Sequence, residues 1–397
     1  MISGNVLLNE GRIVASRPRK AGSVGVPATK SAISVFVHLA HDKDAEAWSR
    51  AWANGTLVGR NDMTPYGYGR AEAMGCRVRF SRSRAENRLQ LFTRLGLRAI
   101  LGFDLLHAFR QRSDIFRSDI VWTHTESQFL AVAMLLMTRK DGPRLIGQSV
   151  WLFDRWPRLW PIRRAFYRFL IRRVDVLTTL SSANAEIARS LFRGKRVEML
   201  HFGLTCDDLG TPNVGARKRA SIVAVGNDRH RDWQTLISAV NDLPSTEVDV
   251  ISHTASGYTS RALPHVHIWP AKGNDQLRAI YSRASVAVVP LTENSHASGI
   301  TAILEAVLAG IPVVTSDVGG LRSYFDDTEM VFVPASDVEA LRAAITRVIT
   351  ERNASLAMAA RAQARILRGP ANVQTYIRRH VEISREVVGA GSSQMRK

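Results

Sequence analysis

The sequence predicts an α/β protein of two doubly wound domains, each a parallel sheet with helices on both faces. Short apolar strands alternate with longer helical segments along the chain. This alternation is interrupted once, at the glycine-rich and polar residues 203–220, and then starts again. The length of 397 residues also suits two domains, because a domain usually has roughly 100–200 residues.

The first half of the chain begins with a basic tail at residues 1–30 that has no periodicity and is expected to be flexible. The strand SAISVFVHLA follows, and then the predicted strands SDIVWTH, PRLIGQSV, VDVLTTLS and RVEMLHFG. ESQFLAVAMLLMTRK and SANAEIARSLF are predicted as helices between them. We therefore expect an N-terminal domain over residues 31–205 and a linker over 206–219.

The second half repeats the pattern, with predicted strands SIVAVGN, TEVDVIS, HVHIWPA, SVAVVPL, IPVVTSD and MVFVPAS. We expect a C-terminal domain over residues 220–370, followed by a helix and tail over 371–397. That helix, NVQTYIRRHVEISREVV, is expected to return to the first domain, with GAGSSQMRK frayed. Open α/β sheets bind ligands at the carboxyl ends of their strands, so two such domains predict a cleft.

The composition favours an anionic partner. Lys and Arg total 54 against 35 acidic residues, a formal charge of +19, which suits nucleic acid, an anionic membrane or phosphorylated substrates. No nucleic-acid reading module accompanies this charge, so we expect no nucleic acid. Cys76 and Cys206 give neither a disulfide framework nor metal-ligand spacing, and without a secretory leader a cytoplasmic location is expected. No apolar run approaches the roughly 20 residues that span a bilayer.

Gly226 and the basic residues after it are a candidate anion-binding turn. Gly226 ends the strand SIVAV and precedes NDRHRDW and a helix. A glycine at such a turn lets a ligand approach the backbone, and Arg229 and Arg231 can offer forked donors to phosphate oxygens. The alternative is an ordinary tight turn with solvated arginines, but a position at a strand end favours phosphate binding.

Glu305 is the charged residue of an otherwise apolar helix predicted from about Ile300 to Leu308. Gly299 precedes this helix, so its loop and free N–H groups form a candidate anion site. The apolar neighbours of Glu305 within the helix cannot neutralise its charge, and an unpaired buried carboxylate is costly. A ligand with vicinal hydroxyls, such as ribose, would satisfy it. A surface carboxylate, or one paired with a distant arginine, is the alternative.

The stretch GITAILEAVLAGIPVVTSDVGG resembles the donor-binding signature of GT-B glycosyltransferases of the large family 4 type. SIVAVGNDRHRDWQTLISAV resembles the phosphate-loop unit of that family, and NDQLRAIYSRASVAVVPL resembles the elements before the signature, so the resemblance covers residues 220–350. It implies a GT-B fold, two Rossmann-like domains facing across a cleft, with a nucleotide-sugar donor in the second. It also implies that Glu305 binds the ribose diol and that Gly226 and its arginines face the diphosphate, with Gly299 and Ile300 at the start of the donor-binding helix.

The signature departs from the family at the sugar. The family usually carries a first glutamate eight positions before the ribose-binding one, and this sequence has Ala297 there. Another group must therefore hold the donor sugar, and His296 and Ser298 are the nearest candidates.

The phosphate loop departs as well. The family commonly has arginine directly after the glycine, whereas Asn227 follows Gly226 here. This leaves open whether Arg229 or Arg231 takes the basic role.

The first domain matches the family only in its alternation of elements. Its strand ends offer His41, Asp42, His124, Glu126 and Asp154. In retaining enzymes of this type a histidine at a strand end approaches the donor sugar, and WTHTES resembles that position. An inverting reaction would instead need a carboxylate base, with Asp154 or Asp42 as candidates, and a distant similarity to the bacterial glucuronosyltransferase of xanthan assembly keeps inversion open. We favour retention, with His41 and Asp42 at the acceptor, against the alternative that each is a structural polar group.

Residues 151–173, WLFDRWPRLWPIRRAFYRFLIRR, hold seven arginines and one acid and predict a basic amphipathic helix. Its apolar stripe is Ile162, Phe166, Phe169 and Leu170. Tryptophans at the entry and a basic stripe are the predicted contacts with an anionic membrane: Trp156, Trp160, Arg164, Arg168 and Arg172. A core helix with a solvated basic face is the alternative.

Together these features predict a hexosyltransferase that moves a sugar from a nucleoside-diphosphate donor to an acceptor held by the first domain. The absence of an Asp-x-Asp cluster leads us to expect no metal, with arginines and helix N-termini stabilising the leaving diphosphate. By family analogy the expected acceptor is a polyprenyl-diphosphate-linked saccharide in exopolysaccharide or lipopolysaccharide assembly, at the inner face of the cell membrane. An epimerase on the same fold and a non-catalytic binding protein are the alternatives.

Overall fold

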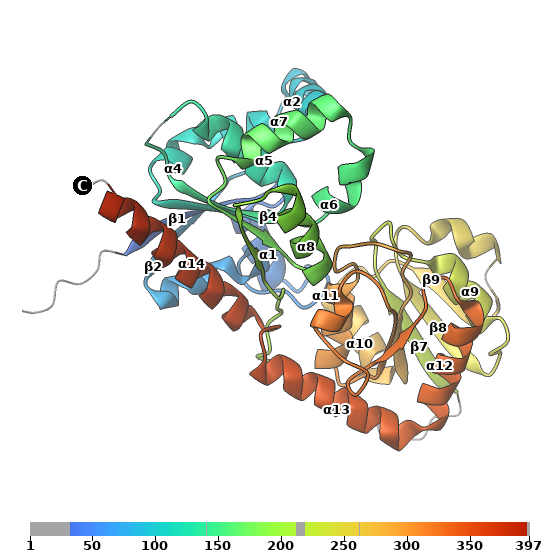
Figure 1. Ribbon diagram of the computed structural model, residues 1–397. Coiled ribbons are helices and arrows are strands. Elements are labelled where there is room, and N and C mark those ends of the chain that lie inside the picture. The colour runs from blue at the N-terminus through green and yellow to red at the C-terminus, as the bar shows by residue number, and fades with distance from the viewer. Residues whose placement is uncertain (1–31, 140, 212–218, 262, 395–397) are drawn as a thin grey trace, which may run out of the picture. The chain divides into compact units, whose positions relative to one another are not determined.

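The computed structural model describes residues 32–139, 141–211, 219–261 and 263–394. They contain two parallel six-stranded sheets, each flanked by helices (Figure 1). This confirms the predicted α/β fold class. The expected tail at residues 1–30 and most of the expected linker lie outside the described residues.

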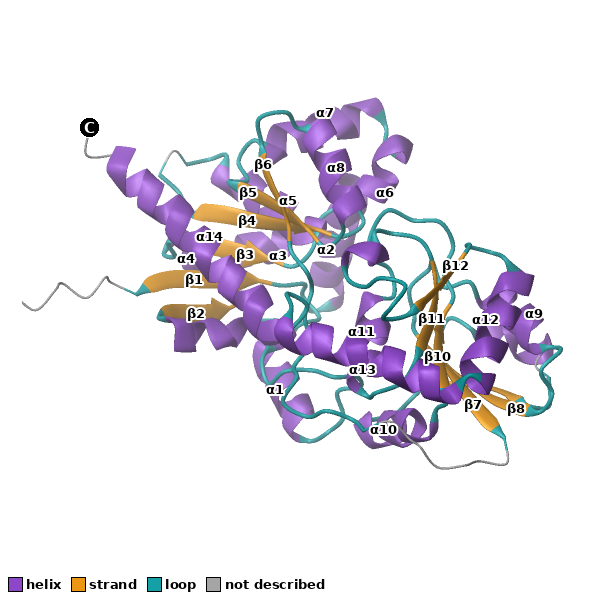
Figure 2. Cartoon of the chain, turned by 60° about the horizontal axis from the view of Figure 1, so that its bottom comes forward, coloured by secondary structure: helices purple, strands orange, loops and turns teal. Residues whose placement is uncertain are grey.

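The first sheet has the strand order β2-β1-β3-β4-β5-β6. Its strands are β1 Ile33–His38, β2 Cys76–Phe80, β3 Ile120–Thr123, β4 Arg144–Ser149, β5 Val176–Thr179 and β6 Arg196–Met199. Its α-helices are α1 Ala45–Ala53, α2 Arg88–Leu101, α3 Leu105–Arg110, α4 Arg112–Phe116, α5 Glu126–Leu136, α6 Leu152–Arg155, α7 Pro161–Ile171 and α8 Ser182–Leu191, with 3₁₀ helices at Pro65–Met74 and Trp156–Arg158. The buried strands read as continuous apolar runs because helices cover both faces of the sheet (Figure 2).

The second sheet has the order β12-β11-β10-β7-β8-β9. Its strands are β7 Ala220–Val225, β8 Thr246–Ile251, β9 Val266–Trp269, β10 Val286–Val289, β11 Val313–Ser316 and β12 Val331–Val333. Its α-helices are α9 Trp233–Val240, α10 Asn274–Arg283, α11 Ile300–Leu308, α12 Val338–Thr350 and α13 Arg352–Arg368, with 3₁₀ helices at Ser256–Arg261 and Leu321–Ser323. Strand order reverses beside β7 and β10, so their carboxyl ends form the crevice where such sheets bind ligands.

The last helix, α14 Val373–Gln394, follows α13 in the sequence. It extends away from the second sheet and packs on the first (Figures 1 and 2). Tyr376 donates a hydrogen bond to Gln148 Oε1 at 2.6 Å, and Trp122 Nε1 donates to Ser384 Oγ at 2.9 Å. The predicted return to the first domain is therefore confirmed. The expectation of fraying from residue 389 is wrong, because the helix continues to Gln394.

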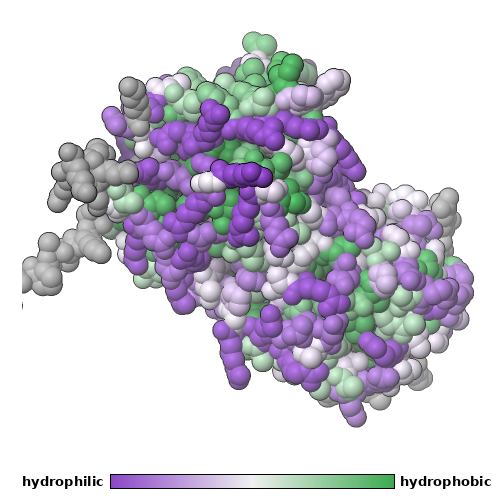
Figure 3. Space-filling view, in the orientation of Figure 1, coloured by the Kyte–Doolittle hydropathy of each residue, from purple (hydrophilic) through white to green (hydrophobic). Residues whose placement is uncertain are grey.

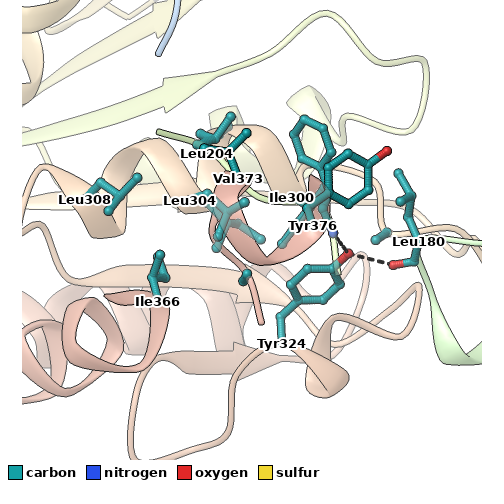
Figure 4. Close-up of a cluster of buried hydrophobic side chains, with 14 of the residues drawn as sticks. Leu180, Leu204, Ile300, Leu304, Leu308, Tyr324, Ile366, Val373 and Tyr376 are labelled. Carbon is teal, nitrogen blue, oxygen red and sulfur yellow. Dashed lines mark hydrogen bonds between the residues drawn. The ribbon is translucent and has the colours of Figure 1, made fainter. Parts of the chain in front are cut away.

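A shared apolar core joins the two halves (Figure 4). The buried face of α11, including Ile300, Leu304 and Leu308, lies in this cluster with Leu180 of the first half. At its edge the Tyr324 hydroxyl donates to the carbonyl of Leu180 at 2.8 Å and accepts from the N–H of Phe202 at 2.9 Å. The helix that carries Glu305 is thus held rigidly at the junction of the two sheets.

No helix within the described residues has both the length and the apolar content needed to cross a membrane.

Candidate active site

The turn after β7 and the start of α11 enclose the guanidinium of Arg231. A Cβ atom built on Gly226 would collide with this guanidinium, and one on Gly299 would lie 2.5 Å from Arg231 Nη1. Both glycines have positive φ, 152° and 78°, which other residues adopt only with strain. Only glycine at both positions leaves room for the arginine between the two turns.

Arg231 lacks hydrogen-bond partners that its chemistry requires. Its side chain is buried, and Nε and Nη1 have no partner among the described residues. Burial lowers the pKa of Arg231 to about 10, so the guanidinium is still charged at neutral pH. Buried unpaired donors are costly. Gly299 offers no side chain to cap α11, so the free N–H groups of its first turn add to a positive site.

Glu305 lies buried in α11, and each carboxylate oxygen has one described partner. Oε1 accepts from the N–H of Arg60 at 2.8 Å, and Oε2 accepts from the Tyr281 hydroxyl at 3.2 Å. Burial raises the pKa of Glu305, against the hydrogen bonds to Arg60 and Tyr281 and the nearby charges of Arg60 and Arg231. The partners come from elements distant in sequence, which the helix alone did not indicate. A carboxylate has about four acceptor positions, so two remain for a ligand.

His296 lies between two carboxylates. Nδ1 contacts Asp154 of α6, and Nε2 lies 3.5 Å from Asp228 Oδ2. Burial disfavours the imidazolium, but its hydrogen bonds to Asp154 and Asp228 outweigh burial and raise the pKa of His296. The same contacts, against burial, lower the pKa values of both acids. His296 is therefore held as a cation bridging the two halves of the chain.

Asp154, His230 and His296 have ligand atoms within 4.8 Å of one another and could reach a common metal ion. However, both nitrogens of His296 face carboxylates, and a protonated imidazole cannot coordinate a metal. His230 Nε2 also accepts from Arg229 Nε at 3.1 Å. An ion pair accounts for this cluster, and we assign no metal to it.

His124, at the carboxyl end of β3, stacks on Tyr66 with ring centroids 3.5 Å apart and an interplanar angle of 12°. Tyr66 adopts a φ of 55°, which strains a non-glycine residue and is typical of functional sites. Burial lowers the pKa of His124 to about 3, with smaller effects from His380 and Lys43. The imidazole is therefore neutral. It can donate or accept a hydrogen bond with a substrate but offers no positive charge.

Buried polar groups fix the orientation of His124. The Tyr68 hydroxyl lies 3.1 Å from His124 Nδ1 and 3.0 Å from the Tyr376 hydroxyl of α14. Gln148 Nε2 donates to the backbone carbonyl of His124 at 3.0 Å. The returning C-terminal helix thus supports the imidazole from behind.

Two cavities meet at His124. The cleft cavity, about 350 Å³, is lined by the Gly226 turn, Arg231, Ser298 and Glu305 from the second half of the chain. The first-half cavity, about 330 Å³, extends along the carboxyl ends of the first sheet. Both are lined by Tyr66, His124, Thr125 and Trp151. A group bound in one can therefore meet a group bound in the other beside His124.

The first-half cavity has a cationic lining. Lys43, Arg98 and Arg155 line it together with His41. Neither Arg98 nor Arg155 has a carboxylate within 4.0 Å among the described residues. Of its acids, Asp104 accepts from Arg94 at 2.7 Å, and Glu126 accepts from the N–H groups of Val150 and Trp151. Because the basic residues outnumber the acids in this lining, its net charge is positive.

The structure brings most predicted site residues to these cavities. The cleft cavity is lined by His124, Gly226, Arg231, His296, Ser298, Gly299, Ile300 and Glu305, and the first-half cavity by His41. Ser298 Oγ is buried without a partner among the described residues, as a ligand-binding hydroxyl would be. Arg229 is exposed outside the cleft cavity, so Arg231 is the arginine at the turn.

The two aspartates proposed as bases are placed differently. Asp154 uses its oxygens on His296 and on Ser295, whose N–H donates at 2.8 Å. Asp42 does not line the first-half cavity; its carboxylate is exposed 3.5 Å from Lys43.

The predicted membrane contacts need correction. Trp156 is only 4% exposed and packs under Arg168, so the prediction for Trp156 is wrong. Arg164 donates to the carbonyls of Leu159 and Pro157, which turns its guanidinium back onto the chain. Leu170 is in the core, because Tyr167, Leu170 and Ile171 form the inward stripe of α7. Trp160, Ile162, Phe169, Arg168 and Arg172 remain exposed.

Sequence reasoning missed Tyr66 and the loop that covers Glu305. In the loop, Gly59 has a φ of 101° and approaches Glu305 Oε1 so closely that a Cβ would lie 2.7 Å away. The glycines around both positions, in GTLVGRN and TPYGYGR, were the available signal. They mark unusual backbone without indicating what the backbone contacts.

Comparison with known proteins finds a family match in the second half of the chain and a shared fold over most of it. Residues 219–351 match the model of the family described as glycosyl transferases group 1. No curated protein has a significantly similar sequence.

Solved structures share the architecture across both domains. Sucrose-phosphate synthase from Thermosynechococcus elongatus aligns with a TM-score of 0.67 at 14% identity, covering 90% of this chain and 100% of that one. HepE from Anabaena, in complex with UDP and glucose, aligns at 0.61 and 13%, covering 89% and 99%. The pneumococcal O-GlcNAc transferase GtfA, with UDP and GlcNAc, aligns at 0.55 and 17%, covering 72% and 60%. At these identities the likeness establishes the fold, which is GT-B.

Proposed function

We propose that this chain, a group 1 glycosyltransferase with the GT-B fold, transfers a sugar from a nucleoside-diphosphate donor to a lipid-linked saccharide. The observation that carries the donor assignment is the buried, charged guanidinium of Arg231, with two nitrogens unpartnered among the described residues between Gly226 and Gly299. A diphosphate supplies the acceptors that these nitrogens lack. The structures of HepE and GtfA hold UDP in the same fold, which supports a nucleotide donor.

The donor lies along α11 in this proposal. Its diphosphate faces Arg231 and the first turn of α11, and its ribose diol donates to the open acceptor positions of Glu305. The sugar then reaches His296, Ser298 and His124, which line the same cavity. The Ser298 hydroxyl, which has no partner among the described residues, takes the place of the missing glutamate at Ala297, and His296, held between Asp154 and Asp228, lines the cavity beside it.

Departure of the diphosphate needs positive charge where negative charge develops. Arg231 and the N-terminal end of α11 supply that charge from fixed positions in a buried site, which is the most effective arrangement for electrostatic catalysis. The proposal therefore requires no metal ion.

The acceptor hydroxyl enters from the first-half cavity and meets the sugar beside the neutral His124. The carboxylates that line the two cavities are Asp104, Glu126, Asp228 and Glu305, and each is engaged by protein donors. An inverting reaction requires a carboxylate free to take the acceptor proton. Glu126, whose hydrogen bonds from backbone N–H groups use only Oε2, is the remaining candidate base in the acceptor cavity, and retention is the outcome that we propose.

The cationic lining of the first-half cavity suits a diphosphate on the acceptor. Lys43, Arg98 and Arg155 could hold the head of a polyprenyl-diphosphate saccharide, as in exopolysaccharide or lipopolysaccharide assembly. The exposed Trp160, Arg168 and Arg172 support a location at the cytoplasmic face of the membrane.

The test is a panel of nucleotide sugars incubated with bacterial lipid extract, with nucleoside-diphosphate release as readout and product linkage determined by NMR. We expect extract-dependent release, a lipid-soluble product and retained anomeric configuration. Arg231→Gln should lower donor affinity by at least about tenfold, the usual effect of losing charged hydrogen bonds. Arg229→Gln is the matched control.

Equal loss in both arginine variants would contradict the placement of the diphosphate. Conversion of the donor alone, without extract, would favour an epimerase instead.

A further inference from the structure

Helix α2 has its apolar and polar sides reversed relative to a core-facing helix. Leu89, Phe92 and Ile100 are 75%, 70% and 72% exposed, whereas Arg94 is 8% exposed. Arg94 turns inward to Glu86 Oε2 at 2.8 Å and Asp104 Oδ2 at 2.7 Å. The helix is thus anchored by ion pairs and presents its apolar side outward, which a water-exposed helix rarely does.

Helix α7 lies against the end of α2 and extends the exposed apolar surface. Arg163 Nη2 donates to the carbonyl of Ile100 at 2.7 Å, and the Tyr167 hydroxyl donates to that of Leu101 at 2.9 Å. Trp160 and Ile162 of this region are 79% and 86% exposed. In Figure 3 hydrophobic side chains protrude at the top of the molecule, where Figure 1 places α2 and α7.

The charges around this surface have one sign. Neither α2 nor α7 contains an acidic residue. Arg88 on α2, Arg168 on α7 and Arg172 directly after α7 are exposed and have no carboxylate within 4.0 Å among the described residues. A protein partner would have to desolvate these interspersed arginines. Lipid phosphates would pair with them while the apolar side chains enter the acyl region.

We infer that α2, together with the exposed side of α7, inserts into the surface of an anionic phospholipid bilayer. We call Leu89, Phe92, Ile100, Trp160 and Ile162 the insertion face. The role of this insertion rests on the proposed function, because insertion would bring the enzyme to an acceptor that is embedded in the membrane. Its physical basis is independent of catalysis.

The insertion face adjoins the cavity proposed for the acceptor. Arg98, two residues before Ile100, lines the first-half cavity, and so does Gly102 at the end of α2. A lipid held beside α2 therefore has its phosphates near Arg98 and its saccharide directed towards His124. The same helix thus contacts both the bilayer and the acceptor head group.

The experiment is flotation of the full chain with vesicles of phosphatidylcholine alone or with about 30 mol% phosphatidylglycerol, which gives the vesicles a strongly negative surface. Leu89→Ser, Phe92→Ser and Ile100→Ser combined should lower partitioning into anionic vesicles by at least about tenfold, since burying even one such side chain is worth about that factor. Arg88→Gln, Arg168→Gln and Arg172→Gln combined should lower it by roughly fivefold per charge, and only on anionic vesicles.

Matched controls are Leu367→Ser on α13 and Arg347→Gln on α12, both in the second half of the chain and away from the insertion face. Both should bind vesicles as the wild type does. Nucleotide binding by each variant reports folding and tests the donor site separately, so a failure of either proposal is distinguishable. Failure of the wild type to float, or equal flotation of the triple serine variant, would overturn the inference. The inference would also be overturned if the wild type were a dimer that bound no vesicles and if the triple serine variant were a monomer.

Discussion

At the scale of single residues, the buried charge of Glu305 is expected to affect ligand affinity and the free energy of unfolding in different ways. Its carboxylate is held by the Arg60 N–H and the Tyr281 hydroxyl, yet burial still raises its pKa. The ionised form is therefore less favourable in the folded chain than in water. The carboxylate therefore adds little to stability, and the proposed donor site gives it a role in binding instead.

Glu305→Gln should therefore weaken donor binding without destabilising the fold. The amide oxygen can still accept from Arg60 while the desolvation cost of the charge disappears, so the free energy of unfolding should not fall. Donor affinity should fall by about tenfold or more, because hydrogen bonds to a charged group contribute roughly 1.5–3 kcal/mol. Calorimetric titration and urea unfolding would measure the two effects.

Glu329→Gln is the matched control, since Glu329 is also a buried glutamate but pairs with Arg365 at 3.4 Å, away from the cavities. Unchanged donor affinity in Glu305→Gln would contradict the ribose assignment.

At the scale of elements, the start of α11 depends on a glycine for two separate reasons. Gly299 has a φ of 78°, and a Cβ there would lie 2.5 Å from Arg231 Nη1 and 2.7 Å from Val289 Cγ1. Gly55 has a similar φ of 67°, but nothing described lies within 4 Å of its Cβ position. A comparison of Gly299 and Gly55 therefore distinguishes the cost of backbone strain, which both share, from the cost of a side-chain collision, which only Gly299 would have.

Gly299→Ala should lower the free energy of unfolding by more than Gly55→Ala does. Strain alone costs about 1–3 kcal/mol, and only Gly299→Ala adds the displacement of Arg231. Donor affinity should fall in Gly299→Ala and stay unchanged in Gly55→Ala. Urea unfolding and nucleotide titration are the measurements, and similar behaviour of the two variants would show that the guanidinium is not confined as described.

The elements that sequence reasoning predicted well are those with a simple apolar pattern. α11 and the strands on either side of it are buried on all sides, so continuous apolar runs indicated them. α2 was missed because its apolar residues face outward and an arginine occupies its inner side. α7 was predicted as a helix, but Leu170, assigned to the apolar stripe of an interfacial helix, is buried with Tyr167 and Ile171, because both sides of the helix carry apolar and aromatic residues.

At the scale of the whole molecule, the cleft is closed by polar contacts between residues far apart in the sequence. Asp154 and Asn184 of the first half bind Ser295 and His296 of the second. The sequence could propose His296 for the cleft, which it does line, because it lies shortly before the start of the signature. It could not reveal the partner, since Asp154 lies 142 residues away.

The His296 ion pair should make the stability of the folded chain dependent on pH. Because Asp154 and Asp228 raise its pKa above the unfolded value of about 6.5, His296 binds a proton more tightly in the folded state. Its stabilising contribution is therefore complete below that value and is lost as pH rises through the folded pKa. Each unit of upward shift corresponds to about 1.4 kcal/mol. The melting temperature should therefore fall as the pH rises above about 6.5, the ordinary pKa of histidine.

The melting temperature of His296→Gln, followed over the same range, should lack this fall, whereas the exposed His253→Gln should retain it. The other groups that face His296 do not imitate the effect. Asp154 and Asp228 have lowered pKa values and stay ionised, and the pKa of His230 is lowered by burial and by His296 itself. The difference between wild type and His296→Gln thus isolates the bridge between the two domains. An identical pH profile for both proteins would mean that His296 is neutral and that the cleft is held closed by its apolar core alone.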